Sequence, residues 1–181
     1  MGIGRATSLA LVLVALGACQ DGGTDPAAAL AAQIRGLDAE GALALANEWR
    51  TTEPGVGSTL TADAVTFVLP GGSQVSVPLP AETMVLAVAP YVTSTHECQI
   101  HSIDGCAGEM AGVPMWVHAE TPDGTVLADQ EMTPMDNGFI ELWLPRDSEI
   151  DLSIQAGALV GGQRVTTYAT SDTCIARIRL Q

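Results

Sequence analysis

The chain has 181 residues and a formal net charge of −14, with 21 acidic residues against 7 arginines and no lysine. Such an acidic protein is a poor binder of nucleic acid and of anionic lipid headgroups. The sequence contains no G-x-S-x-G, no H-E-x-x-H and no glycine-rich phosphate loop, which argues against hydrolytic chemistry.

Residues 1–18 have the pattern of a secretory signal peptide. Arg5 precedes residues 6–16, an apolar run too short to span a bilayer as a helix. The run ends in Leu16-Gly17-Ala18-Cys19, which resembles the lipobox of bacterial lipoproteins and implies cleavage before Cys19 and acylation of its sulfur. We therefore expect an extracytoplasmic protein anchored by lipid, in the periplasm or on the outer face of the cytoplasmic membrane. The alternative is an ordinary signal peptide with an incidental cysteine.

Two short helices follow the signal. Asp25 can cap a helix, and Pro26 suits its first position, which predicts a helix over residues 27–35. Asp38 predicts the start of a second helix that continues to about Trp49 with apolar residues at helical spacing. We expect a helical hairpin that packs against another layer, within an N-terminal part covering residues 19–54.

The remaining part, residues 55–181, reads as strands separated by turn signals. Alternating apolar and polar residues, with turns every eight to twelve positions, are typical of an antiparallel β-sandwich. The expected fold is therefore mainly β with a small α part. The predicted strands cover residues 65–69, 75–79, 83–92, 113–120, 125–132, 139–144, 150–154, 165–170 and 173–180, and residues 157–162 are expected to form a loop.

The count of cysteines points to sulfur chemistry. The chain has four, and acylation would consume Cys19. Three would then remain in a compartment that favours disulfides. An odd number leaves either a disulfide beside a free thiol or a site built from three thiols.

The window 95–106 concentrates ligand-type side chains: His96, Cys98, His101 and Cys106. Thiolate and imidazole suit Cu(I) and also Zn(II), and they are poor ligands for magnesium or calcium. Spacing alone also allows a structural Cys98–Cys106 disulfide, a structural zinc site, or histidines that are simply exposed in a loop. The zinc reading is disfavoured because the window lacks the pair-plus-pair rhythm of zinc fingers.

Cys174 lies far from this window in sequence. In the last predicted strand it shares the apolar face with Ala176, Ile178 and Leu180, while Arg177 lies on the other face. If this end of the sandwich adjoins the 95–106 loop, three sulfurs meet there. Three other residues look structural: Met110 and Met115 are expected to fill the core, and His118 to lie on a strand surface.

Four segments together resemble the CueP family of periplasmic copper-binding proteins. The resemblance extends over roughly residues 84 to 181, with a weaker likeness at Gly36-Leu37-Asp38. The segments are Met84-Val85-Leu86-Ala87-Val88-Ala89-Pro90-Tyr91-Val92, then Thr95-His96-x-Cys98-x-x-His101-x₄-Cys106-x-Gly108-Glu109, then Asp136-Asn137-Gly138-Phe139-Ile140-x-Leu142-Trp143-Leu144-Pro145, and finally Thr173-Cys174.

The resemblance implies a role in copper resistance and supply outside the cytoplasm. It implies that Cys98, Cys106 and Cys174 bind copper as Cu(I), with His96 and His101 as further candidate ligands. It also implies reduction of Cu(II) and delivery of copper to a cuproenzyme. From the cysteine count we expect such reduction to be stoichiometric rather than enzymatic, with Cys98 and Cys106 as the oxidised pair. A homodimer is left open.

The runner-up interpretation is a disulfide-stabilised β-sandwich interaction module without metal. It would carry a stable Cys98–Cys106 bridge and no high-affinity Cu(I) site. A thiol–disulfide exchange protein is disfavoured because the sequence has no C-x-x-C motif.

Overall fold

The computed structural model describes Met1 and residues 25–181. The lipobox, Cys19 and nearly all of the expected signal peptide lie outside these residues and stay predictions. None of the helices in the described residues is long and apolar enough to cross a membrane. In chain order the elements are α1 (Pro26–Ile34), α2 (Ala39–Thr52), β1 (Gly57–Leu60), β2 (Ala64–Val68), β3 (Gln74–Pro78), β4 (Thr83–Val88), β5 (His101–Ser102), β6 (Met115–Glu120), β7 (Val126–Met132), β8 (Ile140–Pro145), β9 (Glu149–Ala156), β10 (Leu159–Thr166) and β11 (Cys174–Ile175).

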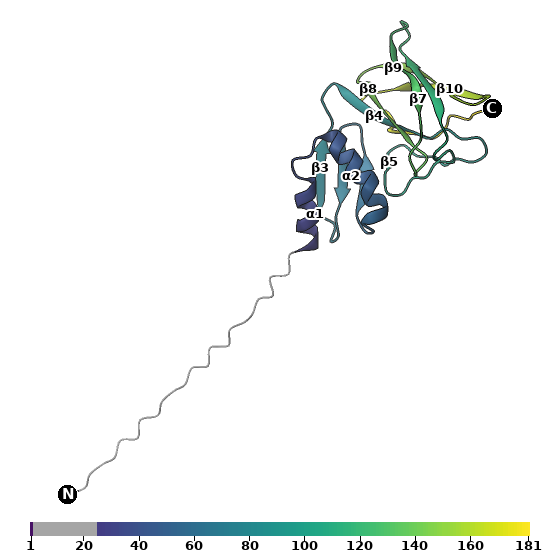
Figure 1. The fold of residues 1–181 in the computed structure, drawn as a ribbon. Coiled ribbons are helices and arrows are strands. Elements are labelled where there is room, and N and C mark those ends of the chain that lie inside the picture. The colour runs from purple at the N-terminus through teal and green to yellow at the C-terminus, as the bar shows by residue number, and fades with distance from the viewer. Residues whose placement is uncertain (2–24) are drawn as a thin grey trace.

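The predicted helical hairpin is confirmed, including both caps. The Asp25 side chain accepts a hydrogen bond from the Ala27 backbone N–H at 3.0 Å, and that of Asp38 accepts from Gly41 at 2.8 Å. Helices α1 and α2 lie against the sheet β3-β2-β1-β5 (Figure 1). Trp49 of α2 meets Phe67 of β2 edge-on, with ring centroids 5.5 Å apart. The sheet supplies the layer that the apolar faces of the helices required.

The other strands form two sheets that face each other as a sandwich. Their strand orders are β10-β9-β6-β7 and β11-β4-β8. A shared apolar core contains residues such as Leu86, Val117 and Ile154. Pairing is antiparallel throughout these two sheets except between β11 and β4, which are parallel. The mainly β fold with a small α part is therefore as the sequence predicted.

Strand β4 is buried on both faces and joins the two halves of the fold. Leu86 packs in the sandwich core, whereas its neighbours Val85 and Ala87 pack in a second core together with the helices and β2. Cys106, Phe139 and Cys174 belong to this second core. It is the core that surrounds the candidate site.

Two expectations about strands near the C-terminus are wrong. Residues 157–162 are not a loop, because β10 begins at Leu159 and carries Gly161 and Gly162 within it. A Cβ at Gly161 would collide with the carbonyl oxygen of Arg179, so this glycine marks a close approach of backbones rather than a turn. The last predicted strand shrinks to Cys174–Ile175.

Because regular pairing ends at Ile175, the expected common face of the last segment also breaks. Cys174 and Ala176 enter the core beneath the helices, whereas Ile178 and Leu180 enter the sandwich core. The short strands β1 and β5 were not predicted. Their pairing, Leu60 opposite His101, holds the middle of the 95–106 window against the first sheet.

Candidate metal centre

Four of the predicted ligand residues converge in space. One ligand atom from each of His96, Cys98, Cys106 and Cys174 lies within 4.8 Å of all the others. Three of these residues come from the 95–106 window and the fourth opens β11, so the end of the sandwich adjoins the loop as the sequence suggested. Cys174 is fully buried and Cys106 is 9% exposed, whereas Cys98 and His96 are half-buried.

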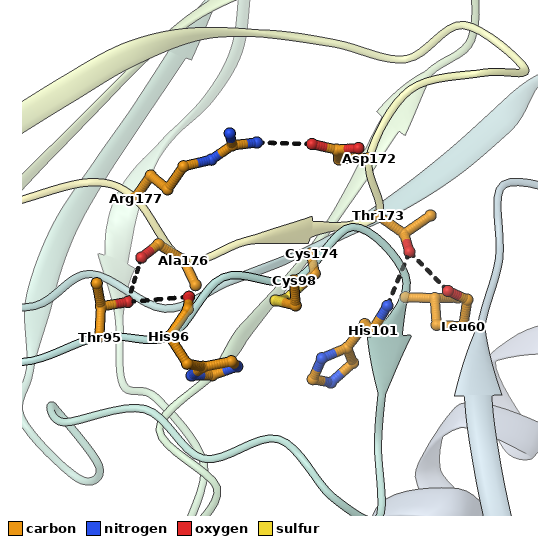
Figure 2. Close-up of a disulfide and its surroundings, with 10 residues drawn as sticks. All are labelled: Leu60, Thr95, His96, Cys98, His101, Asp172, Thr173, Cys174, Ala176 and Arg177. Carbon is orange, nitrogen blue, oxygen red and sulfur yellow. Dashed lines mark hydrogen bonds and ion pairs between the residues drawn. A yellow bond between two sulfur atoms is a disulfide. The ribbon is translucent and has the colours of Figure 1, made fainter.

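Backbone pairing places Cys174 against the window. The carbonyl oxygen of Gln99 accepts hydrogen bonds from the backbone N–H groups of Thr173 and Cys174, at 2.8 and 3.1 Å. The Thr173 hydroxyl donates to the Leu60 carbonyl at 2.6 Å and accepts from the His101 backbone N–H at 3.1 Å (Figure 2). Thr173 thus links β1, β5 and β11 next to the sulfurs.

Cys98 and Cys174 form a disulfide, with Cα atoms 5.7 Å apart. Among the cysteines that the structure describes, Cys106 is the unpaired one, and it is buried. The expected Cys98–Cys106 pair is therefore wrong. The reason is a long-range contact: the Gln99 pairing lays Cys98 beside Cys174, while Cys106 closes a separate turn through a 2.8 Å bond from its N–H to the Ser102 carbonyl.

The two histidines of the window occupy different positions. His96 belongs to the four-residue group, and its Nε2 is buried without a hydrogen-bond partner among the described residues. His101 lies outside the group and is fully buried, and both its ring nitrogens also lack a partner there. Burial, followed by the influence of His96 and Arg50, lowers the pKa of His101 to about 4. Both imidazoles are shown on the same side of the disulfide in Figure 2.

Phe139 supports both imidazoles, and sequence reasoning did not single it out. Its ring centroid lies 4.3 Å from that of His101 and 6.3 Å from that of His96. Its sequence signals were its place directly after the Asn137-Gly138 turn and its inclusion in the third segment that resembles the CueP family. Packing of two histidines against one aromatic ring orients their nitrogens in an otherwise apolar surrounding.

The remaining candidates have structural roles, as expected. Met115 is buried in the sandwich core, and Met110 packs against that core. His118 lies on the surface of β6, with its two ring nitrogens 3.2 Å from an Asp129 oxygen and 3.4 Å from a Glu120 oxygen. These carboxylates raise the pKa of His118, chiefly through the hydrogen bond to Asp129.

The donor set fits a soft metal ion. Three sulfurs and one imidazole nitrogen within 4.8 Å of one another suit Cu(I), which accepts thiolate and imidazole without demanding a planar or octahedral shell. The unpartnered buried Nε2 of His96 strengthens the fit, because a buried polar atom without a partner is costly and a ligand would satisfy it. With the disulfide closed, only Cys106 offers a thiol, so the sulfur set is complete only after reduction.

Comparisons with known proteins agree with this chemistry. The family model described as "Periplasmic copper-binding protein CueP" matches residues 44–179, which include the whole site. The crystal structure of S.CueP is similar, with a TM-score of 0.77 and 29% sequence identity over 86% of this chain and 96% of that chain. Among the curated proteins, none matches the chain. Because the family match covers well over half of the sequence, the chain belongs to the CueP family of periplasmic copper-binding proteins.

Proposed function

We propose that this protein holds Cu(I) through Cys98, Cys106 and Cys174, with His96 as a fourth ligand. The observation that carries the proposal is the convergence of these four side chains within 4.8 Å. Membership of a copper-binding family supports the choice of copper over zinc. Bound copper would be cargo, held for buffering and for handover to a recipient cuproenzyme.

The disulfide gives the same site a redox role. When two thiols become a disulfide they release two electrons and two protons, which is enough to reduce two Cu(II) ions to Cu(I). Cys98 and Cys174 are the pair that closes in this protein. Of the three site cysteines, a molecule that has closed the pair keeps only Cys106 as a thiol, so it cannot also hold Cu(I) through three thiolates. Reduction is therefore stoichiometric unless an external thiol reductant returns two electrons to the pair.

Closing the pair also affects stability. The bridge spans 76 residues of sequence, for which the chain-entropy model gives a stabilisation of about 4 kcal/mol. The reduced, copper-ready form is less stable by a comparable amount. Cu(I) bound across the same residues restores part of this loss, because a ligand that binds only the folded state stabilises it.

Anaerobic titration of the fully reduced protein tests both roles. One equivalent of Cu(I) should be retained against a chelating dye, because three thiolates are available. Cu(II) added instead should yield about two Cu(I) per molecule to the dye, with two thiols lost and a Cys98–Cys174 disulfide found by mass spectrometry. Cu(II) that stays unreduced while all three thiols survive would remove the redox role. Release of all added Cu(I) to the dye would remove the binding role.

The proposed lipid anchor rests on the lipobox before Cys19. Replacement of Cys19 by Ala should move the protein from the membrane fraction to the soluble fraction, because acylation needs the cysteine sulfur. Cu(I) binding should not change, since the proposed ligands lie between residues 96 and 174 and Cys19 is not among them. Detection of a free, alkylatable Cys19 thiol in a soluble wild-type protein would exclude the anchor.

A further inference from the structure

The carboxylate of Glu109 collects three consecutive backbone N–H groups. Its Oε2 accepts hydrogen bonds from Val92 and Thr93 at 2.9 Å and from Ser94 at 3.1 Å. These bonds, that of Thr93 first, lower the pKa of Glu109 to about 2. Because the acceptor is charged, each bond is stronger than a bond between neutral groups. The contact therefore links two segments that lie 15 to 17 residues apart in sequence.

The two linked segments carry two of the proposed ligands. Residues 92–94 belong to an irregular stretch that leads directly to His96. Glu109 follows Cys106 by three residues. A single side chain thus ties the backbone that presents the imidazole to the loop that presents the unpaired thiol.

The loop on the Glu109 side is itself fixed. The Gly108 N–H donates to the Asn137 carbonyl at 2.6 Å, and a Cβ on Gly108 would lie 2.6 Å from the carbonyl oxygen of Gly138. Gly108 is therefore packed directly against the turn that precedes Phe139. Glu109 projects from this packed backbone and gives residues 92–94 a rigid attachment.

The His96 segment has few other attachments close to the ring. The Thr95 hydroxyl donates to the Ala176 carbonyl, and the His96 and Phe139 rings form an edge-type pair with centroids 6.3 Å apart. Thr93 and Ser94 are exposed to solvent. Without Glu109, three exposed backbone N–H groups would turn to water and the segment would lose its link to the Cys106 loop.

We propose that Glu109 is a positioning residue that holds His96 over the three cysteine sulfurs. The inference rests on the proposed function, because it requires His96 to ligate copper. If Glu109 only capped the turn at residues 92–94, its replacement would affect folding stability alone. A positioning residue should affect Cu(I) affinity through His96, and only while His96 is present.

A double-mutant cycle on the full chain separates these roles. Glu109→Gln keeps the shape of the side chain and one acceptor oxygen but removes its charge, so the bonds from the three N–H groups lose their charge-assisted strength. Under reducing conditions, Glu109→Gln should weaken Cu(I) binding by about 10-fold, within the range for residues that orient a metal ligand. His96→Ala should weaken it by at least as much. The double variant should match His96→Ala alone, since the effects of coupled residues do not add.

Glu97→Gln is the matched control. Glu97 is an exposed carboxylate next to Cys98, so the substitution removes the same charge near the sulfurs without touching residues 92–94. It should change Cu(I) affinity by less than about 2-fold, because exposed charges are screened by solvent. X-ray absorption of Cu(I)-loaded Glu109→Gln should show a reduced nitrogen contribution with the sulfur contribution unchanged, and the Glu97→Gln spectrum should match the wild type.

Three results would overturn the inference while leaving the three-thiol site intact. They are an unchanged affinity in Glu109→Gln, an unchanged affinity in His96→Ala, and a loss in Glu109→Gln that persists in full in the His96→Ala background. Failure of the proposed function has a different signature, because it would leave Cu(I) binding insensitive to the cysteine substitutions as well.

Discussion

Cys106→Ser should weaken Cu(I) binding by about 100-fold or more, whereas the oxidised protein should lose only the cost of a hydroxyl in place of the buried thiol, about 1–3 kcal/mol. Serine replaces a soft thiolate by a hard hydroxyl, which Cu(I) binds poorly. Cys106 takes no part in the disulfide, so the Cys98–Cys174 bridge and its contribution to stability remain. Competition with a chelating dye under anaerobic, reducing conditions measures the affinity, and thermal unfolding without reductant measures the stability.

Cys98→Ser and Cys174→Ser provide the complementary result. Each should lower Cu(I) affinity by a similar factor and should also cost the oxidised protein about 4 kcal/mol, because each removes the bridge across 76 residues. His118→Ala is the negative control, since this histidine lies on the surface of β6 with carboxylate neighbours and should leave Cu(I) affinity unchanged. Wild-type affinity in reduced Cys174→Ser would mean that this buried cysteine only fills the core.

The contrast among the three cysteines also explains what the sequence could and could not reveal. Soft ligand types concentrated in one window, and an odd number of available cysteines, were enough to indicate sulfur chemistry, whereas Cys174 joined the expected ligands through the resemblance to the CueP family. Which two sulfurs pair was beyond reach, because pairing depends on how the Gln99 carbonyl bonds to Thr173 and Cys174. Such a contact spans more than 70 residues and has no local pattern.

The same limit applies to the fold. Helix caps and alternating strands are local signals, and Asp25, Asp38 and most strands followed them. Gly161 misled because a glycine that permits close backbone approach looks the same in sequence as a glycine that permits a turn. Strand β5 escaped notice because its two residues form a strand only through pairing with β1. Tertiary contacts decided these elements.

Gly138 should be among the least replaceable residues of the fold, for reasons that also involve long-range contact. Its φ is +81°, a conformation that disfavours any side chain, and a Cβ there would collide with the backbone of Gly108. The left-handed backbone costs a non-glycine residue roughly 1–2 kcal/mol, and forced displacement of packed neighbours roughly 1–3 kcal/mol more. We therefore expect Gly138→Ala to destabilise the protein by about 2–5 kcal/mol.

Gly124→Ala separates the two contributions. Gly124 has a φ of +86°, nearly the same as Gly138, but a Cβ there would have no neighbour within 4 Å. Gly124→Ala should therefore lose only the backbone part, roughly 1–2 kcal/mol. Chemical denaturation of both variants and the wild type measures the difference. Equal losses at the two positions would show that the Gly108–Gly138 contact adds nothing beyond the backbone conformation.

Gly138→Ala and Gly124→Ala should differ even more in Cu(I) affinity than in stability. Gly138 precedes Phe139, whose ring supports His96 and His101, and it packs against the loop that runs from Cys106 to Glu109. A shift of this turn would therefore move two parts of the site at once: Phe139, which packs against His96, and the loop backbone that carries Cys106. Gly138→Ala should therefore lower Cu(I) affinity in molecules that remain folded, whereas Gly124→Ala, in the turn between β6 and β7, should not. Wild-type Cu(I) affinity in folded Gly138→Ala would mean that the site tolerates a shift of the turn that precedes Phe139. The close packing of Gly108 and Gly138 would then serve stability alone.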